Sequence, residues 1–298
     1  MQRPNRRCAT SRGFSRALRD VVMKSHLVLC VVVLVVLGGE APASAADLKS
    51  ETVAAFDRYQ RAAEAAIAAD IDSPERFLRI LHVDPASRQD AEEQLRTGGV
   101  AVAKLQVTEQ GKRIAIPDGL VHHWMGAVFV PGTRIGDAVA LMQDYDRHHT
   151  IFRPAIAQSK TLDHDGDRFR LFLRFFMKKV ITVVVNTDST AEFTHLASNR
   201  VVSAIRSTRV QELEEPGTPR EREKPVGRDG GYLWRLNSYW RFLERDGGTY
   251  IECESLTLTR GIPIGFGWIV GPFVTSLPRE LLASTLQTTR KTLVGSRS

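Results

Sequence analysis

The stretch YLWRLNSYWRFLERDGGTYIECESLTLT, residues 232–259, decides the fold. Two runs of alternating character flank the turn RDGG, and this pattern predicts a long antiparallel hairpin. One face of the hairpin is apolar and aromatic and consists of Trp234, Leu236, Trp240, Phe242, Ile251 and Cys253. The other face is polar and consists of Arg235, Asn237, Tyr239, Arg241, Glu252 and Glu254. Because an antiparallel sheet commonly packs one face on the core, we expect the aromatic face to line the interior.

The rest of the chain predicts further strands of this kind, with helices at both ends. In RFRLFLRFF, residues 168–176, one face consists of Phe169, Leu171, Leu173 and Phe175. Residues 46–99 predict a helical N-terminal extension, and residues 277–294 predict a long C-terminal helix with Leu282 and Leu286 on one line. A curved antiparallel sheet can bury its apolar face against one long helix. The predicted fold class is therefore α+β.

These stretches resemble the START-like superfamily, also called SRPBCC, which includes polyketide cyclases and lipid-transport proteins. The resemblance covers residues 119–293. It rests on GAVFVPGTRIGDAVALMQDYDRHHTIFRP, residues 126–154, as first strand and short helices, and on RLNSYWRF and YIECESLTLTRGIP as the last hairpin. The stretches are most similar to those of secreted bacterial members. The resemblance implies a helix-grip fold, in which a curved antiparallel sheet wraps around the C-terminal helix, but it implies no shared catalytic signature.

The N-terminus predicts export. Residues 27–37, LVLCVVVLVVL, form an apolar run behind basic residues, and Ala43-Ser44-Ala45 fits the small-residue cleavage pattern of a signal peptide. We therefore expect a basic leader plus signal peptide over residues 1–45, with the signal peptide at Met23 to Ala45, the extension over 46–99 and a ligand-binding domain over 100–298. The expected location is periplasmic or secreted. An uncleaved N-terminal anchor in the membrane is the alternative, although eleven apolar residues are short for a span.

Removal of the leader changes the charge of the protein. The whole chain has a net charge of +7, but the part after Ala45 keeps 34 basic and 32 acidic residues, a net charge of +2. Binding to nucleic acid needs a retained basic surface, so we expect no nucleic-acid partner. Cys253 is the single cysteine after Ala45, which excludes an internal disulfide in the processed chain.

The function that we expect is the binding or transport of a hydrophobic small molecule, such as a lipid, an isoprenoid or a polyketide-like compound. The ligand would lie in a cavity between the sheet and the C-terminal helix, stabilised by burial of its apolar surface and oriented by a few polar groups. The candidate lining residues are Phe169, Leu171, Leu173, Phe175, Trp234, Trp240, Phe242, Ile251, Leu282 and Leu286. Each of them is also an ordinary core candidate.

Two further features bear on the ligand site. His122 and His123 are adjacent, so on a strand they point to opposite faces and cannot both bind one ion; one is expected near the cavity and the other under the extension. The glycine-interrupted stretch GIPIGFGWIVGPF, residues 261–273, is expected to be an apolar connector or a lid that carries Phe266 and Trp268 and makes transient membrane contact.

Two other functions stay open. A cyclase or aromatase would need a titratable group inside the cavity, and His122, His123 and Tyr239 are the candidates. A non-catalytic periplasmic interaction module would use the extension to hold a partner.

Other chemistry finds little support in the sequence. Glu252 and Glu254 share a face with Arg241, which favours cross-strand charge pairing over acid–base catalysis, unless the extension buries all three. DYDRHH, residues 144–149, lacks the second cluster that a metal site needs. No G-x-S-x-G, P-loop or G-x-G-x-x-G sequence occurs. We therefore assign no catalytic residue, no metal and no cofactor.

Overall fold

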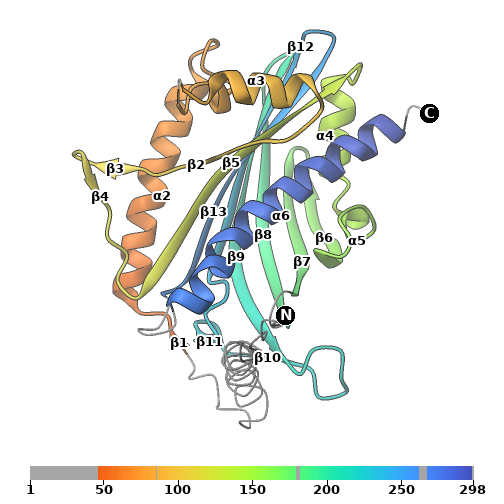
Figure 1. Ribbon diagram of the computed structural model, residues 1–298. Coiled ribbons are helices and arrows are strands. Elements are labelled where there is room, and N and C mark those ends of the chain that lie inside the picture. The colour runs from red at the N-terminus through yellow and green to blue at the C-terminus, as the bar shows by residue number, and fades with distance from the viewer. Residues whose placement is uncertain (1–45, 85, 179–181, 262–266, 297–298) are drawn as a thin grey trace, which may run out of the picture. The chain divides into compact units, whose positions relative to one another are not determined.

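A sheet of nine strands organises the protein, as the computed structural model shows (Figure 1). The described residues are 46–84, 86–178, 182–261 and 267–296, with the backbone alone described for Ala46 and for residues 267–275. Eight strands lie in the order β2-β5-β13-β12-β9-β8-β7-β6, and β10 pairs with β9. Their bounds are β2 Ala101–Lys104, β5 Gly119–Pro131, β6 Ile156–Asp165, β7 Arg168–Lys178, β8 Thr182–Ala197, β9 Arg200–Glu214, β10 Arg222–Glu223, β12 Arg235–Arg245 and β13 Gly248–Arg260.

Every pairing in this sheet is antiparallel. The predicted last hairpin is confirmed, because β12 and β13 pair from Arg235–Leu258 to Arg245–Gly248 around Asp246-Gly247. Both turn residues have positive φ values, 57° and 73°, which the Asp-Gly sequence accommodates. Two small ladders lie apart from the main sheet, β1 (Ala46–Asp47) with β11 (Arg228–Asp229), and β3 (Thr108–Glu109) with β4 (Lys112–Arg113).

The inner face of the sheet is the face that packs against α6 (Gly267–Gly295), which crosses it obliquely (Figure 1). The chain between β5 and β6 adds α4 (Ile135–Gln143), η2 (Tyr145–Arg147) and α5 (His148–Ile151) to the same core. Gly126 of β5 lets α6 approach closely, since a Cβ atom there would lie 2.7 Å from Leu286 Cδ1. This arrangement is the predicted helix-grip fold.

The outer face of the sheet is covered by the N-terminal extension over β5, β13 and β12. The extension consists of α2 (Ser50–Ile71), η1 (Arg79–Leu81) and α3 (Arg88–Arg96). Phe56 and Tyr59 of α2 pack with Leu256 and Leu258 of β13 in a second buried cluster. Apolar side chains on both faces of β5 and β13 are thereby explained, because both faces are buried.

The structure differs from the predicted helices in two respects. The predicted helical extension is not continuous, because the segment after Pro74 forms turns and the short 3₁₀-helix η1, and α3 begins only at Arg88. The C-terminal helix begins at Gly267, ten residues before the predicted Leu277. Glycine costs a helix only about 1 kcal/mol, so the glycines after Gly267 do not by themselves prevent helix formation.

Candidate functional site

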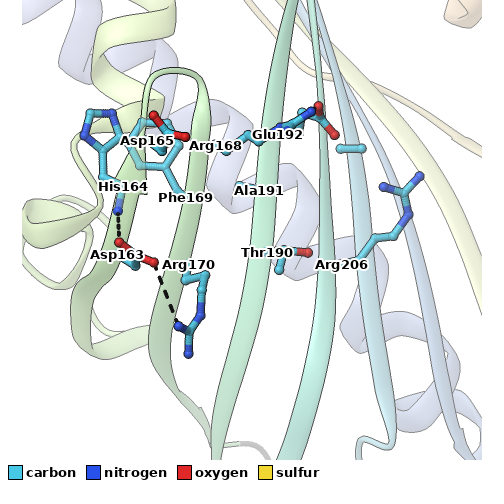
Figure 2. Close-up of a pocket in the computed structure, with 11 residues that line it drawn as sticks. Asp163, His164, Asp165, Arg168, Phe169, Arg170, Thr190, Ala191, Glu192 and Arg206 are labelled. Carbon is cyan, nitrogen blue, oxygen red and sulfur yellow. Dashed lines mark hydrogen bonds and ion pairs between the residues drawn. The ribbon is translucent and has the colours of Figure 1, made fainter.

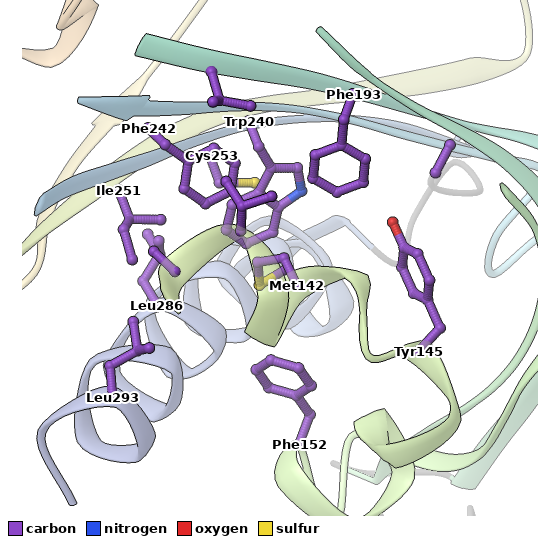
Figure 3. Close-up of a cluster of buried hydrophobic side chains, with 14 of the residues drawn as sticks. Met142, Tyr145, Phe152, Phe193, Trp240, Phe242, Ile251, Cys253, Leu286 and Leu293 are labelled. Carbon is purple, nitrogen blue, oxygen red and sulfur yellow. The ribbon is translucent and has the colours of Figure 1, made fainter. Parts of the chain in front are cut away.

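The inner face gathers nine of the ten predicted lining residues. Eight are buried in one cluster, namely Phe169, Leu171, Leu173, Trp240, Phe242, Ile251, Leu282 and Leu286, and the partly buried Phe175 packs against them. Figure 3 shows the aromatic part of this cluster between the sheet, α4 and α6. The cross-strand register explains the grouping, because Phe242 pairs with Ile251 and Trp240 with Cys253 on the same face.

Trp234 does not lie with these residues, and its predicted place on the inner face was wrong. It packs with Phe56 and Tyr59 of α2 under the extension, and its indole Nε1 donates to Asp229 Oδ1 at 3.0 Å. The reason is that β12 begins only at Arg235, so the alternation of the strand does not apply to Trp234. The hydrogen bond to Asp229 fixes the indole on the outer side.

The two adjacent histidines point to opposite faces, as expected for a strand. His122 lies on the inner face opposite Thr257, and its Nε2 is 3.1 Å from Thr259 Oγ1. His123 lies on the outer face, where Nε2 is 2.7 Å from Glu254 Oε1 and Nδ1 is 3.1 Å from the Tyr59 hydroxyl. The third candidate for cavity chemistry, Tyr239, also faces outward and donates to Glu64 Oε1 at 2.7 Å. Of the three, His122 alone faces α6.

The predicted lid falls largely outside the described residues. Phe266 is not described, and Trp268 lies in the part of α6 for which the backbone alone is described.

Polar groups interrupt the apolar inner face in successive rows. One row, across β5, β13, β12 and β9, consists of Trp124, Ser255, Ser238 and Ile205, and the next consists of His122, Thr257, Leu236 and Ser207. Ser207 is used internally, because its hydroxyl accepts from Leu236 N at 3.0 Å. Trp124, Ile205, Leu236, Ser238 and Ser255 are only partly buried, although all face the helix side. The side chains in this half of the inner face are therefore more exposed than those of the cluster around Trp240.

Two buried hydroxyls in this region have no hydrogen-bond partner among the described residues. One belongs to Ser203, which pairs with Trp240 in the register of β9 and β12, and the other belongs to Tyr145 of η2. Tyr145 is 1% exposed, packs edge-on to Phe169 and directs its hydroxyl toward the sheet (Figure 3). Buried hydroxyls usually have partners, so both are candidates to bind a polar group of a ligand.

Sequence reasoning missed Tyr145, because DYDRHH was weighed as a metal or helix-end motif. In the structure the charged residues of this motif make local contacts: Asp144 pairs with Arg147 at 3.2 Å, and Asp146 accepts from Thr161 N at 2.8 Å. Within the described residues, no three His, Cys, Asp or Glu side chains converge as metal ligands would. The signal that could have identified Tyr145 is its place two residues after the end of the amphipathic helix at Gln143.

Burial keeps the titratable groups of the inner side neutral. It lowers the pKa of His122 to about 4, with a smaller contribution from the charge of Lys104. Burial also lowers the pKa of His148, which packs on Tyr145, to about 4. The pKa of the Tyr145 hydroxyl and that of the Cys253 thiol are both raised by burial. At neutral pH these groups are therefore uncharged.

A buried charge network lies on the opposite side, between the sheet and the extension. Arg241, Glu252 and Glu254 are at most 1% exposed. Arg241 Nη1 donates to Glu252 Oε1, whose other oxygen accepts from Ile80 N at 2.8 Å. Glu254 is approached by Arg79 Nη1 at 3.4 Å as well as by His123. The extension thus buries Arg241, Glu252 and Glu254 together, which is the exception that the sequence left open.

The two carboxylates of this network titrate in opposite directions. Burial raises the pKa of Glu252, and the charge of Arg241 only partly opposes this shift. Burial also acts on Glu254, but the hydrogen bond from His123 and the nearby positive charges outweigh it and lower its pKa. Glu254 is contacted by Arg79 of the extension and by His123 of β5, so the network joins the extension to the sheet.

Two surface pockets lie among the described residues, one mainly on the outer side of β7–β9 and the other beside α4. The pocket in Figure 2 has a volume of about 280 Å³ and is lined mainly by charged and polar side chains of β6–β9, including Arg168, Arg170 and Glu192. Several of these charges pair with one another, for example Arg168 with Glu192 at 3.1 Å. The second, here called the α4 groove, has a volume of about 460 Å³ and is lined by Ile135, Gly136, Val139, Ala140, Gln143, His195, Ala197, Ser198 and Val201. Val139 and Val201 also belong to the inner core, so the α4 groove reaches that core from outside.

Strand order, the short helices after the first long strand and the C-terminal helix together define a START-like helix-grip fold. No protein-family model and no curated protein sequence matches the chain.

Similar solved structures include the STAR-related lipid transfer protein from Xanthomonas axonopodis, with 17% identity and a TM-score of 0.42 over 65% of this chain and 93% of that one. The Zhui aromatase/cyclase from Streptomyces sp. R1128 has 12% identity and a TM-score of 0.40 over 58% and 94%. Human STARD10 has 8% identity and a TM-score of 0.42 over 66% and 69%. At such values the fold assignment rests on the topology of this chain itself.

Proposed function

We propose that this protein binds a hydrophobic small molecule, of lipid, isoprenoid or polyketide-like character, between the inner face of the sheet and α6. The observation that carries the proposal is the combination of an apolar inner face with buried hydroxyls that have no hydrogen-bond partner within the described ranges. Ser203 and Tyr145 lie within the apolar cluster, and each hydroxyl is buried at a cost unless something hydrogen-bonds to it. A mostly apolar ligand with one hydroxyl or carbonyl group would meet that need.

The electrostatics of the inner side favour binding over catalysis. An efficient general base has a pKa near the working pH, whereas that of His122 is about 4. The raised pKa of Tyr145 likewise makes this hydroxyl a poor acid near pH 7. We therefore favour a carrier over the alternative of a cyclase or aromatase.

The α4 groove supplies a route for the ligand in this proposal. It lies between α4 and the turn after β8, and Val139 and Val201 form part of both the groove and the core. A small outward movement of α4 would therefore join the groove to the inner face. The predicted lid at Phe266 and Trp268, with transient membrane contact, remains a second proposed opening.

Export of the protein is part of the proposal and is supported by the sequence of residues 23–45. Among the helices of the described ranges, none is long and apolar enough to cross a membrane.

Native mass spectrometry of the protein purified from an exporting bacterial host tests the binding. We expect a co-purifying apolar compound of defined mass that organic extraction removes. The stripped protein should then bind the fluorescent probe N-phenylnaphthylamine. Ile205→Trp, which enlarges a side chain in the partly exposed half of the inner face, should weaken probe binding at least tenfold.

Thr194→Trp is the matched control, because it places the same side chain at an exposed position of β8 and should leave probe binding unchanged. Protein that is consistently free of ligand and binds the probe equally well in both variants would refute the proposal.

A further inference from the structure

Two carboxylates are buried beside each other where the chain approaches β12. Asp229 is 1% exposed and Glu212 is 2% exposed. Glu212 accepts from Gly230 N and Tyr232 N, both at 2.7 Å, so it is held against the residues that follow Asp229. Asp229 Oδ1 accepts from Gly231 N at 2.8 Å and from the Trp234 indole. Its other oxygen, Oδ2, has no hydrogen-bond partner among the described residues.

Among the described residues, no cation forms an ion pair with Asp229. Lys224 Nζ lies 3.5 Å from Glu212 Oε2 and compensates that carboxylate. Arg228 points to the exposed Asp47 at 3.4 Å, and Arg260 lies over the Tyr232 ring. Burial, together with the negative charge of Glu212, accordingly raises the pKa of Asp229 to about 6. A buried carboxyl in this state would be stabilised by a cation at Oδ2.

The strand register places the backbone nitrogen of Ala46 opposite the backbone of Asp229. β1 and β11 pair antiparallel with Ala46 opposite Asp229, and Leu48 N donates to Gly227 O at 2.8 Å (Figure 1). Hydrogen-bonded pairs alternate along an antiparallel ladder, so Ala46 and Asp229 form the next one and the Ala46 nitrogen faces Asp229. Ala46 is also the residue that follows the predicted cleavage sequence Ala43-Ser44-Ala45.

We propose that Asp229, supported by Glu212, is the binding site for the α-ammonium group that cleavage after Ala45 creates on Ala46. A signal peptidase hydrolyses the Ala45–Ala46 amide with one water molecule, which leaves a carboxylate on Ala45 and an ammonium on Ala46 at neutral pH. One N–H of the ammonium keeps the ladder bond to the Asp229 carbonyl, and another donates to Oδ2. The inference rests on the proposed export and is independent of ligand binding.

Formation of this ion pair would couple leader removal to the segment before β12. The same carboxyl holds Gly231 and the Trp234 indole, and Trp234 packs beneath α2. Processing would therefore stabilise the junction between β1, β11 and the extension, which stays incomplete while the leader is attached.

The test uses the full chain expressed in an exporting host, with the terminus of the processed protein identified by mass spectrometry. The pKa of the terminal amine is then measured by NMR. It should lie at least one unit, a tenfold change in proton affinity, above the ordinary value of about 7.7–8.0. Asp229→Asn keeps Oδ1 and should return the pKa to the ordinary range. Asp47→Asn, which removes an exposed carboxylate next to the terminus, should leave most of the shift.

A glycine inserted between Ala45 and Ala46 provides a variant without any substitution in the core, and it should also abolish the shift. Because the folded-state pKa of the amine is raised, its contribution to stability is complete below the unfolded value and is lost as pH rises through the folded value. The melting temperature of the processed protein should therefore fall as pH rises through the folded-state pKa of the amine. That of Asp229→Asn should show no such fall.

A terminus other than Ala46, an unshifted amine or equal effects of Asp229→Asn and Asp47→Asn would overturn the inference. An absent ligand in native mass spectrometry would refute the proposed binding function alone.

Discussion

The substitution Arg241→Met tests how the extension is held on the sheet. Arg241 is 1% exposed and pairs with Glu252, which is 0% exposed. Removing one member of a buried ion pair costs about 3–5 kcal/mol, because the remaining charge stays buried. In the part of the chain that the structure describes, Arg241 Nε and Nη2 have no hydrogen-bond partner, and methionine relieves the cost of burying them. We therefore expect the lower end, about 3 kcal/mol, or about 6–12 °C in melting temperature.

The loss should depend on pH and on Glu252. Without Arg241 the pKa of Glu252, already raised by burial, rises further. A carboxyl with a raised folded-state pKa contributes its stability below the unfolded value, and this is lost as pH rises through the folded value. The free energy of unfolding of Arg241→Met should consequently be closer to that of the unmodified protein at pH 5 than at pH 8. Adding Glu252→Gln removes the unpaired charge, so the double variant should be less destabilised than the sum of the single variants by about 1–3 kcal/mol.

Urea unfolding followed by tryptophan fluorescence at pH 5, 7 and 8 measures these differences. Arg168→Met is the control, since Arg168 and its partner Glu192 are 75% and 53% exposed and such pairs contribute about 0–1 kcal/mol. The reasoning fails if Arg241→Met costs no more than this control, if its cost is the same at all three pH values, or if the double variant is additive.

Three further outcomes are expected. Gly126→Val should lower the free energy of unfolding by about 1–3 kcal/mol, because its Cβ would meet Leu286 at 2.7 Å, whereas Gly136→Ala, with nothing within 4 Å, should not destabilise; equal losses in urea unfolding would contradict this packing. Cys253, buried and with a raised pKa, should react with a disulfide reagent in absorbance assays only after unfolding, and rapid reaction of the native protein would show that this site opens. Ala140→Trp should fill the α4 groove and slow N-phenylnaphthylamine uptake at unchanged melting temperature; unaltered uptake would exclude this route.

Period-two alternation predicted the sheet because each strand of the last hairpin has distinct faces. The same alternation separated His122 from His123 and brought Trp240, Phe242 and Ile251 together. It failed for Trp234, where a residue before the strand is held by a side-chain hydrogen bond instead. Strand alternation carries no information about a side-chain partner that lies outside the strand.

The polar part of the candidate site was less accessible to sequence reasoning. The proposed roles of Tyr145 and Ser203 follow from hydroxyls without partners in the described ranges, and such a lack can be recognised only once the surroundings are in place. The carboxylates Glu252 and Glu254 could be paired with Arg241 from the register. Their complete burial depended on the placement of α2 and η1, which no spacing in the hairpin determines.

The double-sided burial of β5 and β13 has a consequence for fragments of this protein. A chain that started at Val100 would contain every strand of the main sheet and α6. It would nevertheless present Met125, Leu256 and the Arg241–Glu254 pair to solvent on a broad surface. Such a surface promotes aggregation, so we expect the shortened chain to be insoluble, although it retains the complete inner face of the sheet.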